Sequence, residues 1–153
     1  MNNKEYLPDI YRSLYHKTRL NVMLSASWMS EFIRRFMEQY DITGQQYNIM
    51  RIIDRNQGNH LSILQIREQM FEKMSDTSRL VDRLITKGLV GKRKSTTDRR
   101  LVEIYLTNEG ENLLTKIMEN IEELDLPLKG LTEEEAGVLS NLLIKMRHHD
   151  NNE

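Results

Sequence analysis

Only one segment of this 153-residue chain alternates apolar and polar residues like a β-strand, and much of the remainder has the apolar periodicity of α-helices. The alternating segment runs from Leu101 to Leu106, and the run from Leu89 to Lys94 is its expected partner strand. The alternation predicts that one face holds Val102, Ile104 and Leu106 and the other holds Glu103 and Tyr105. A single hairpin therefore limits the fold to a mainly α protein whose helices pack around one small ribbon.

Capping residues mark where the helices begin. The reciprocal capping box, a hydroxyl residue followed three positions later by Gln or Glu, occurs at Thr43 with Gln46, Ser62 with Gln65, and Thr132 with Glu135. Ser75 and Thr107 are further N-cap candidates. These starts predict helices over 44–56, 63–70, 76–87, 108–125 and 133–147, and an apolar stripe with a spacing of four predicts a long helix over 19–40. A short helix, a turn, a second helix and a charged hairpin make a winged helix-turn-helix.

The net charge of −1 hides a basic block in the middle of the chain. Residues 73–100 hold nine basic and three acidic side chains, a balance of +6, whereas residues 101–153 hold four basic and twelve acidic ones, a balance of −8. A basic block in an otherwise neutral chain favours a surface that faces a polyanion such as nucleic acid. An ordinary solvated charged face remains the alternative.

Composition and motifs argue against several other classes of protein. The chain has no cysteine, which excludes disulfides, thiol redox switches and thiolate metal sites. Its four histidines do not suggest a metal cluster, and no phosphate-binding glycine loop or nucleophile elbow occurs, so we expect neither a cofactor nor an enzyme. No apolar run approaches the roughly 18–20 residues of a membrane span. The N-terminus lacks the apolar core of a signal peptide, so we expect a cytoplasmic protein without a membrane partner.

The predicted helix after Ser75 has an apolar face and a face of short polar or basic side chains. Major-groove readout needs such a polar set near a helix N-terminus, because bases are read through hydrogen bonds. The candidate DNA contacts on this helix are Ser75, Asp76, Thr77, Ser78, Arg79, Arg83 and Lys87. Arg79 suits a guanine edge, the hydroxyl residues suit bases, methyl groups or phosphates, and the two basic residues further along suit phosphates. The acid in the first turn favours the helix dipole but would repel a nearby phosphate. An ordinary amphipathic surface helix is the alternative.

The hairpin supplies a second set of candidate contacts. The residues expected to bind phosphates are Lys92, Arg93 and Lys94. Arg99 and Arg100 fall at the tip, where one of them can enter a narrow groove that concentrates negative potential. Asp98 is expected to hold a neighbouring arginine through a charge-assisted pair and so fix the shape of the tip.

Two stretches resemble the multiple-antibiotic-resistance regulator (MarR) family of bacterial transcription factors, namely SDTSRLVDRLITKGLV at residues 75–90 and DRRLVEIYLTNEG at residues 98–110. The family pattern of an Asp-x-Arg wing tip, an alternating strand and Leu-Thr-x-x-Gly is filled by Asp98, Arg100, Leu106, Thr107 and Gly110. The order of helices over nearly the whole chain also agrees with the family. The resemblance implies an obligate homodimer that places Arg100 in the minor groove and the helix from Ser75 in the major groove of double-stranded DNA.

The resemblance also implies how the chain is divided and regulated. Residues 1–153 would form one unit, with dimerisation helices in residues 1–40 and 111–153 and the DNA-binding winged helix-turn-helix in residues 41–110. Two apolar stripes are available to a dimer, one of Leu113, Leu114, Ile117, Ile121 and Leu124 and one of Val138, Leu139, Leu142, Leu143 and Met146, although burial within one chain is the alternative. The implied function is a ligand-responsive regulator, commonly a repressor, with a small aromatic or phenolic effector. A winged helix that binds a protein instead of DNA remains the second hypothesis.

Overall fold

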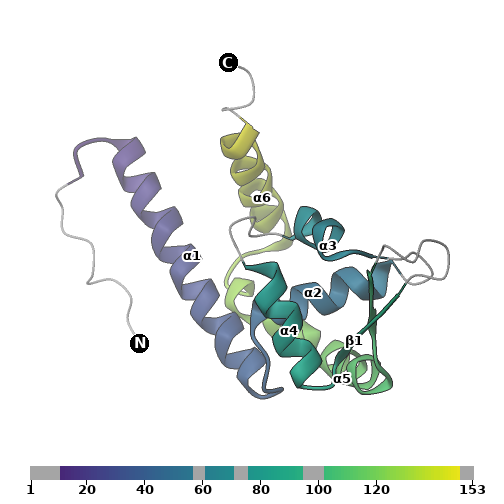
Figure 1. The fold of residues 1–153 in the computed structure, drawn as a ribbon. Helices are drawn as coiled ribbons and strands as arrows, with labels where there is room; N and C mark the ends of the chain where they lie inside the picture. The colour runs from purple at the N-terminus through teal and green to yellow at the C-terminus, as the bar shows by residue number, and fades with distance from the viewer. Residues whose placement is uncertain (1–10, 57–60, 71–75, 95–101, 149–153) are drawn as a thin grey trace.

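The computed structural model describes residues 11–56, 61–70, 76–94 and 102–148. Figure 1 shows the order of its elements: α1 (Leu14–Glu38), α2 (Gly44–Arg55), α3 (Ile63–Gln69), α4 (Thr77–Thr86), β1 (Val90–Lys94), β2 (Val102–Leu106), α5 (Asn108–Glu119), the 3-10 helix η1 (Ile121–Leu128) and α6 (Glu133–His148). The two strands form one antiparallel hairpin. This order confirms the predicted mainly α fold with a winged helix-turn-helix.

The predicted capping boxes are present at three helix starts. The side chains of Thr43 and Ser62 each accept a hydrogen bond from the backbone N–H of the glutamine three residues later. The backbone N–H of each cap residue in turn donates to Oε1 of that glutamine. Thr132 and Glu135 exchange the same pair of bonds, at 2.8 and 3.2 Å. Thr107 caps α5, as predicted. These starts were predictable because each bond joins residues three positions apart.

Helix α4 begins one residue later than predicted. We expected Ser75 as its N-cap, but Asp76 takes that position and accepts a hydrogen bond from the backbone N–H of Arg79 at 3.3 Å. Ser75 itself lies outside the described residues. A carboxylate caps a helix as well as a hydroxyl does, so either residue was chemically suitable.

The predicted helix over 108–125 is also shorter than expected. Helix α5 ends at Glu119, and the chain continues as η1, which includes Pro127. The side chain of Asn120 donates hydrogen bonds to the carbonyl of Lys116 and to the hydroxyl of Tyr40, both at 3.2 Å. These bonds occupy a carbonyl of the last turn and tie the helix end to the segment after α1.

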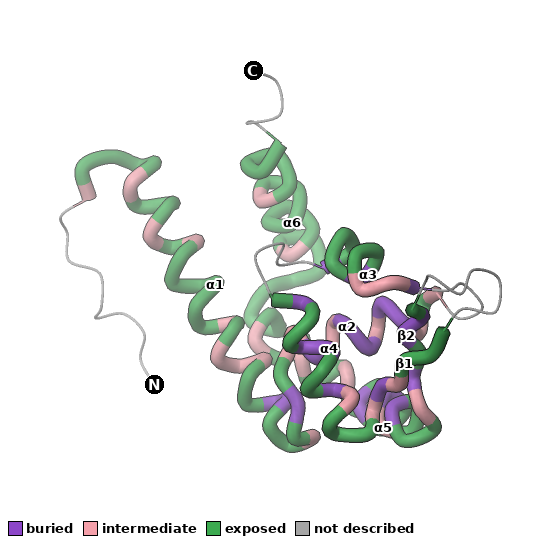
Figure 2. The backbone as a smooth tube through the Cα atoms, viewed as in Figure 1, coloured by how far each residue is buried: buried purple, intermediate pink, exposed green. Residues whose placement is uncertain are grey.

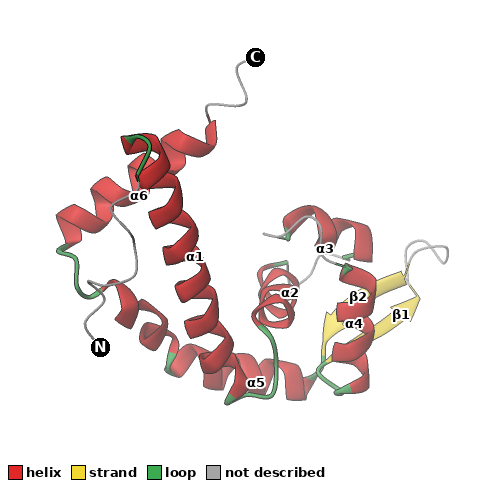
Figure 3. Cartoon of the chain, turned by 90° about the vertical axis from the view of Figure 1, so that its left-hand side faces the viewer, coloured by secondary structure: helices red, strands yellow, loops and turns green. Residues whose placement is uncertain are grey.

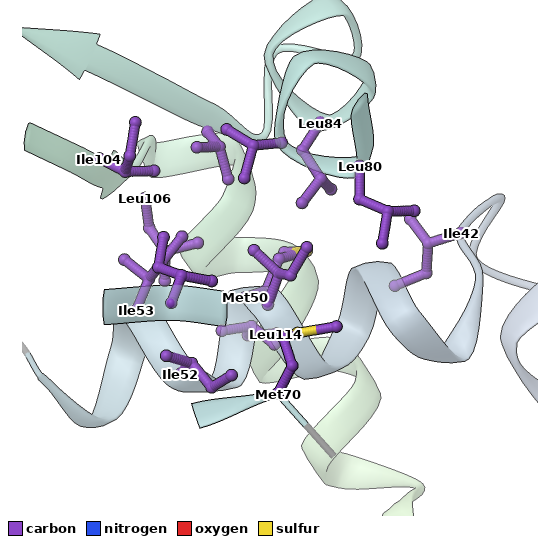
Figure 4. Packing of buried hydrophobic residues seen from close by; sticks show 14 of the residues in the cluster. Ile42, Met50, Ile52, Ile53, Met70, Leu80, Leu84, Ile104, Leu106 and Leu114 are labelled. Atoms are coloured by element: carbon purple, nitrogen blue, oxygen red, sulfur yellow. The ribbon is translucent and has the colours of Figure 1, made fainter. Parts of the chain in front are cut away.

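The hydrophobic core is built around α2, which contacts α1, α3, α4, α5 and β2. Met50 of α2, Leu84 of α4 and Ile117 of α5 are completely buried. Figure 4 shows side chains from α2, α4, α5 and β2 converging on this core, with Met50 near its centre. Because α4 and β2 lie on the same core, the helix and the hairpin that carry the predicted DNA contacts are held in fixed relation to each other.

Helices α1 and α6 extend beyond this core. Only the C-terminal end of α1 is buried, through Phe36 and Met37, and α6 has no buried residue. Figure 2 shows both helices as mainly exposed, and Figure 3 shows the hairpin on the opposite side of the molecule from them. None of the helices in the described segments is long and apolar enough to cross a membrane.

The hairpin confirms the predicted strands, but burial along β2 does not simply follow the apolar and polar faces. Ile104 and Leu106 are buried as expected, whereas Val102 is 47% exposed and Glu103 is only 2% exposed. Val102 pairs with Lys94 at the end of the ribbon that is farthest from the helices joined to it. Glu103 lies opposite Arg93 in the register and forms an ion pair with it at 3.0 Å. Alternation alone did not predict this burial, because it depends on a charge partner on the neighbouring strand.

Candidate nucleic-acid interface

Helix α4 is fixed to the protein by its apolar face and exposes the opposite face. Leu80, Val81 and Leu84 are buried against the core, and the helix contacts α2, α3 and β1. The exposed face consists of Ser78, Arg79, Asp82, Arg83 and Thr86. This face contains the polar and basic set expected from the sequence, with one exception at its start, and it also includes the acidic Asp82, which was not predicted.

The exception is Thr77, which we expected to face solvent. Its relative exposure is 3%, so the expectation is wrong. Thr77 is the first residue of α4, and its side chain belongs to the buried side of the helix. The exposed side of the first turn is left to Asp76, Ser78 and Arg79.

Asp76 and Arg79 form a local unit at the start of α4. The Oδ1 atom of Asp76 accepts the hydrogen bond from the backbone N–H of Arg79 at 3.3 Å. The Oδ2 atom lies 3.0 Å from Nε of the same arginine. Both side chains are exposed, at 55% for Asp76 and 82% for Arg79. The acid that opens the helix therefore also holds the exposed cation of its first turn.

Lys87, predicted to bind phosphate, is engaged inside the chain. Its Nζ atom donates hydrogen bonds to the backbone carbonyl and to the carboxylate of Asp41, and its side chain is 31% exposed. Asp41 lies between α1 and α2 in a left-handed backbone conformation, with a φ of 53°. The contact joins the end of α4 to the turn between α1 and α2, where the winged helix-turn-helix begins. Local sequence did not predict it, because the two residues are 46 positions apart.

Arg93 is also held by the protein rather than free in solvent. Its Nε donates a hydrogen bond to Oε2 of Glu103 at 3.0 Å, and its guanidinium lies 5.1 Å from the ring centroid of Tyr105. The same ring covers Gly91, where an added Cβ would lie only 2.4 Å from Cζ of Tyr105. Glu103 and Tyr105 were not among the predicted site residues. The cross-strand register could have indicated them, but it depends on where the loop between the strands turns.

Of the other predicted contacts on the hairpin, two lie in the described segments and three do not. Lys92 and Lys94 are exposed on β1. Asp98, Arg99 and Arg100 lie outside the described residues, so their predicted roles at the wing tip stay predictions. Among the described residues, no three His, Cys, Asp or Glu side chains are grouped so that they could hold a metal ion.

Comparison with known proteins decides the family. The MarR family model matches residues 40–101, which include α2, α3, α4 and β1. The HTH-type transcriptional regulator FarR of Neisseria gonorrhoeae is 31% identical over 119 residues, which cover 77% of this chain and 80% of FarR. The chain belongs to the MarR family of transcriptional regulators. Its relatives in this family are regulators rather than enzymes, in agreement with the expectation from the sequence.

Other relatives of this MarR-family chain extend the similarity to nearly its whole length. The uncharacterised HTH-type transcriptional regulator YsmB of Bacillus subtilis is 28% identical over 145 residues, or 94% of this chain and 92% of YsmB. The solved structure of the MepR–DNA complex of S. aureus is 26% identical with a TM-score of 0.72, and the match covers 84% of this chain and 94% of MepR. The similarity therefore includes α1 and α6 as well as the winged helix-turn-helix.

Proposed function

We propose that this MarR-family chain is a ligand-responsive repressor that binds a pseudo-palindromic operator as a homodimer. The observation that carries the proposal is the exposed polar and basic face of α4, held rigidly beside the basic strand β1. An α-helix fits the major groove of DNA, and an adjacent basic ribbon can follow the phosphate backbone. The relative MepR, 26% identical, has been solved as a DNA complex, which supports the same role here.

Two exposed apolar helix faces support a dimer. Met23, Leu24 and Trp28 of α1 are between 50% and 58% exposed, and Val138 and Leu142 of α6 are 54% and 59% exposed. Large exposed apolar patches generally mark interaction surfaces, because water does not solvate them favourably. Two copies related by a dyad would also present two α4 helices to half-sites about 34–36 Å apart.

Fewer of the residues proposed from the sequence for dimer contacts remain exposed in the structure. In the first predicted stripe, Leu114 and Ile117 of α5 are buried in the core of their own chain, and Leu113, Ile121 and Leu124 pack against that core. Burial within one chain is therefore correct for this stripe. The second stripe, on α6, stays mainly exposed and is the surface that we propose for the partner copy, together with α1.

Sedimentation of matched variants tests the dimer. The wild-type chain should sediment at about twice its 18.2 kDa mass at micromolar concentration. Leu142→Glu should give a monomer, because it places a charge in the proposed apolar contact. Ser140→Glu is the control, since two helical positions away it faces nearly the opposite side, and it should remain dimeric. A monomeric wild-type chain would contradict the proposed symmetric binding.

DNA binding is tested by salt titration. The probe is a duplex selected by the purified wild-type protein from a random library long enough for two half-sites, about 10 base pairs apart from centre to centre. The logarithm of affinity should fall steeply with the logarithm of salt concentration, with a slope of about −0.9 for each neutralised phosphate. Arg100→Ala should weaken binding by about 1–3 kcal/mol without changing the dimer. A flat salt response would favour the alternative of a winged helix that binds a protein.

A cavity beside the α1–α2 corner is the site that we propose for a small aromatic effector. Its volume is about 540 Å³, and it is lined by Ser30, Ile33, Arg34, Glu38, Ile42, Thr43, Gly44, Gln45, Asn48 and Met70. Its position between α1 and the winged domain would let a ligand change the angle between them. Benzoate is a suitable probe of the ligand class and should shift the amide NMR signals of lining residues. Ser30→Trp should abolish these shifts by filling the rim, and shifts that persist in this variant would argue against the site.

A further inference from the structure

The first turn of α4 contains an acidic residue on the surface proposed to face DNA. Asp76 contacts Arg79 twice, through Oδ1 at the backbone N–H and through Oδ2 at Nε. We propose that Asp76 is a positioning residue for base recognition, which holds the guanidinium of Arg79 in the orientation that reads one base pair. This inference rests on the proposed DNA-binding function and assigns the base-specific step of that function to a pair of residues.

Capping alone does not require an acid at this position. Asn, Ser and Asp cap helices about equally well, because each accepts the hydrogen bond from the first turn. A negative charge on the reading surface also opposes the basic block, since it repels phosphates. The carboxylate is therefore unfavourable for general DNA affinity, and its second contact, with the side chain of Arg79, gives it a separate role.

The geometry of the pair explains how the carboxylate can orient an exposed arginine. The backbone N–H of Arg79 is fixed by the helix, so the cap hydrogen bond fixes the position of the Asp76 carboxylate. That carboxylate then anchors Nε, near the far end of a long side chain that is otherwise 82% exposed. Without the anchor, the free arginine would lose more rotamer entropy when it binds a base.

The atom used for the ion pair suits guanine recognition. An arginine carries five N–H donors in a fixed planar fork, and one of them is on Nε. Pairing at Nε leaves the donors on the two Nη atoms, which can reach O6 and N7 of guanine as a bidentate pair. The expected target of Arg79 is therefore a G·C base pair read from its major-groove edge.

Arg83 provides an internal comparison on the same helix. It is exposed one turn after Arg79, and in the described part of the chain it takes part in no ion pair. An unanchored arginine at this distance from the helix start suits phosphate contact, which adds affinity but little sequence preference. Loss of Arg83 should therefore weaken binding to all sequences by a similar factor.

The test compares specificity profiles, that is, the affinity for each singly replaced duplex relative to the selected one, rather than single affinities. The probes are the duplex selected by the wild-type protein and a set in which each base pair of one half-site is replaced in turn. Asp76→Asn keeps the cap but removes the charge, and Arg79→Ala removes the reading group. Affinities are measured by fluorescence anisotropy at one salt concentration. Thermal unfolding of Asp76→Asn should show only a small loss of stability, about 1 kcal/mol or less, because an exposed charge at a helix start contributes little. This measurement separates positioning from folding.

The wild type should prefer one G·C pair by about 5- to 150-fold over its replacements, the range of one bidentate contact. Asp76→Asn should lower this preference to about threefold or less at that position alone, with affinity for unrelated duplex unchanged or higher because a repulsive charge is lost. Arg79→Ala should lose the same preference, and Arg83→Ala should keep it while binding all duplexes more weakly.

Two results would overturn the proposal. If Asp76→Asn raised affinity for every duplex by one factor and kept the profile of the wild type, Asp76 would be only a cap and a repulsive charge. If Arg79→Ala kept the G·C preference, Arg79 would not be the reading group. A wild-type protein that enriched no duplex from the library would instead contradict the proposed DNA-binding function itself.

Discussion

Among the glycines in the described segments, Gly110 in the first turn of α5 is predicted to be the least tolerant of an added methyl group. A Cβ built at this position would lie 2.1 Å from the carbonyl oxygen of Leu89 and 3.1 Å from its carbonyl carbon. An ordinary contact begins at 3.4 Å, so the Cβ–O distance is 1.3 Å too short. Because the obstructing atoms belong to the backbone, no side-chain rotation can relieve the overlap, and α5 must move away from the segment between α4 and β1.

That movement would strain the hydrogen bonds that join the two segments. The backbone N–H of Thr107 donates to the carbonyl of Leu89 at 3.2 Å, and the Thr107 hydroxyl donates to the carbonyl of Gly88 at 2.6 Å. Two weakened hydrogen bonds lower stability by about 1 kcal/mol each, and overpacking adds about 1–3 kcal/mol. The better helix propensity of alanine offsets about 0.5–1 kcal/mol. Gly110→Ala should therefore lower the free energy of unfolding by about 2–4.5 kcal/mol.

Urea unfolding at a fixed protein concentration measures this change, because the stability of a dimer depends on concentration. Gly137→Ala is the matched control: it makes the same chemical change in α6, where an added Cβ meets nothing within 4 Å in this chain. It should be neutral or more stable by about 0.5–1 kcal/mol. An ordinary surface substitution changes stability by about 0.5 kcal/mol or less. If Gly110→Ala stayed within that range of the wild type, α5 could move away from Leu89 at little cost, and the close approach would not restrict this position.

Three further predictions concern charged side chains. Lys87→Met should lower the free energy of unfolding by about 0.5–1 kcal/mol. It should change the salt slope of DNA binding by less than about 0.9, the change expected when one phosphate contact is lost, because the ammonium of Lys87 is already bonded within the chain. Arg93→Met should lower the free energy of unfolding in urea by about 1–2 kcal/mol, because it removes the cation beside buried Glu103. Adding Glu103→Leu should restore much of the loss. A double variant as unstable as the single one would contradict this prediction. Hydrogen bonds from Arg34 and Arg35 lower the pKa of Glu31 from 4.5 to about 2, so their contribution to stability is present above about pH 4.5 and is lost as pH falls toward 2. An NMR titration should show the pKa of Glu31 rising toward 4.5 in Arg34→Ala, and an unchanged pKa would be the contrary result.

The helix starts and the hairpin of this protein could be predicted from its sequence because the interactions that form them are local. The capping hydrogen bonds of Thr43, Ser62 and Thr132 each join residues three positions apart. The alternating strand and the basic block also lie within short stretches of chain, and with the family pattern they indicated a winged helix-turn-helix. Even so, two adjacent candidates for one cap, Ser75 and Asp76, could not be distinguished, because both are good capping residues.

Only the tertiary structure decided which charged groups are free to act. It pairs Lys87 with Asp41 and Arg93 with Glu103, so two of the predicted phosphate contacts are already engaged. It buries Thr77, and it explains Gly110 by the close approach of a backbone segment 21 residues earlier in the chain. Sequence periodicity reports which side of an element is apolar, but it does not report which distant atoms come to lie against that side. Those contacts arise only when the elements pack around α2, and they determine the orientation of the side chains that we propose to meet DNA.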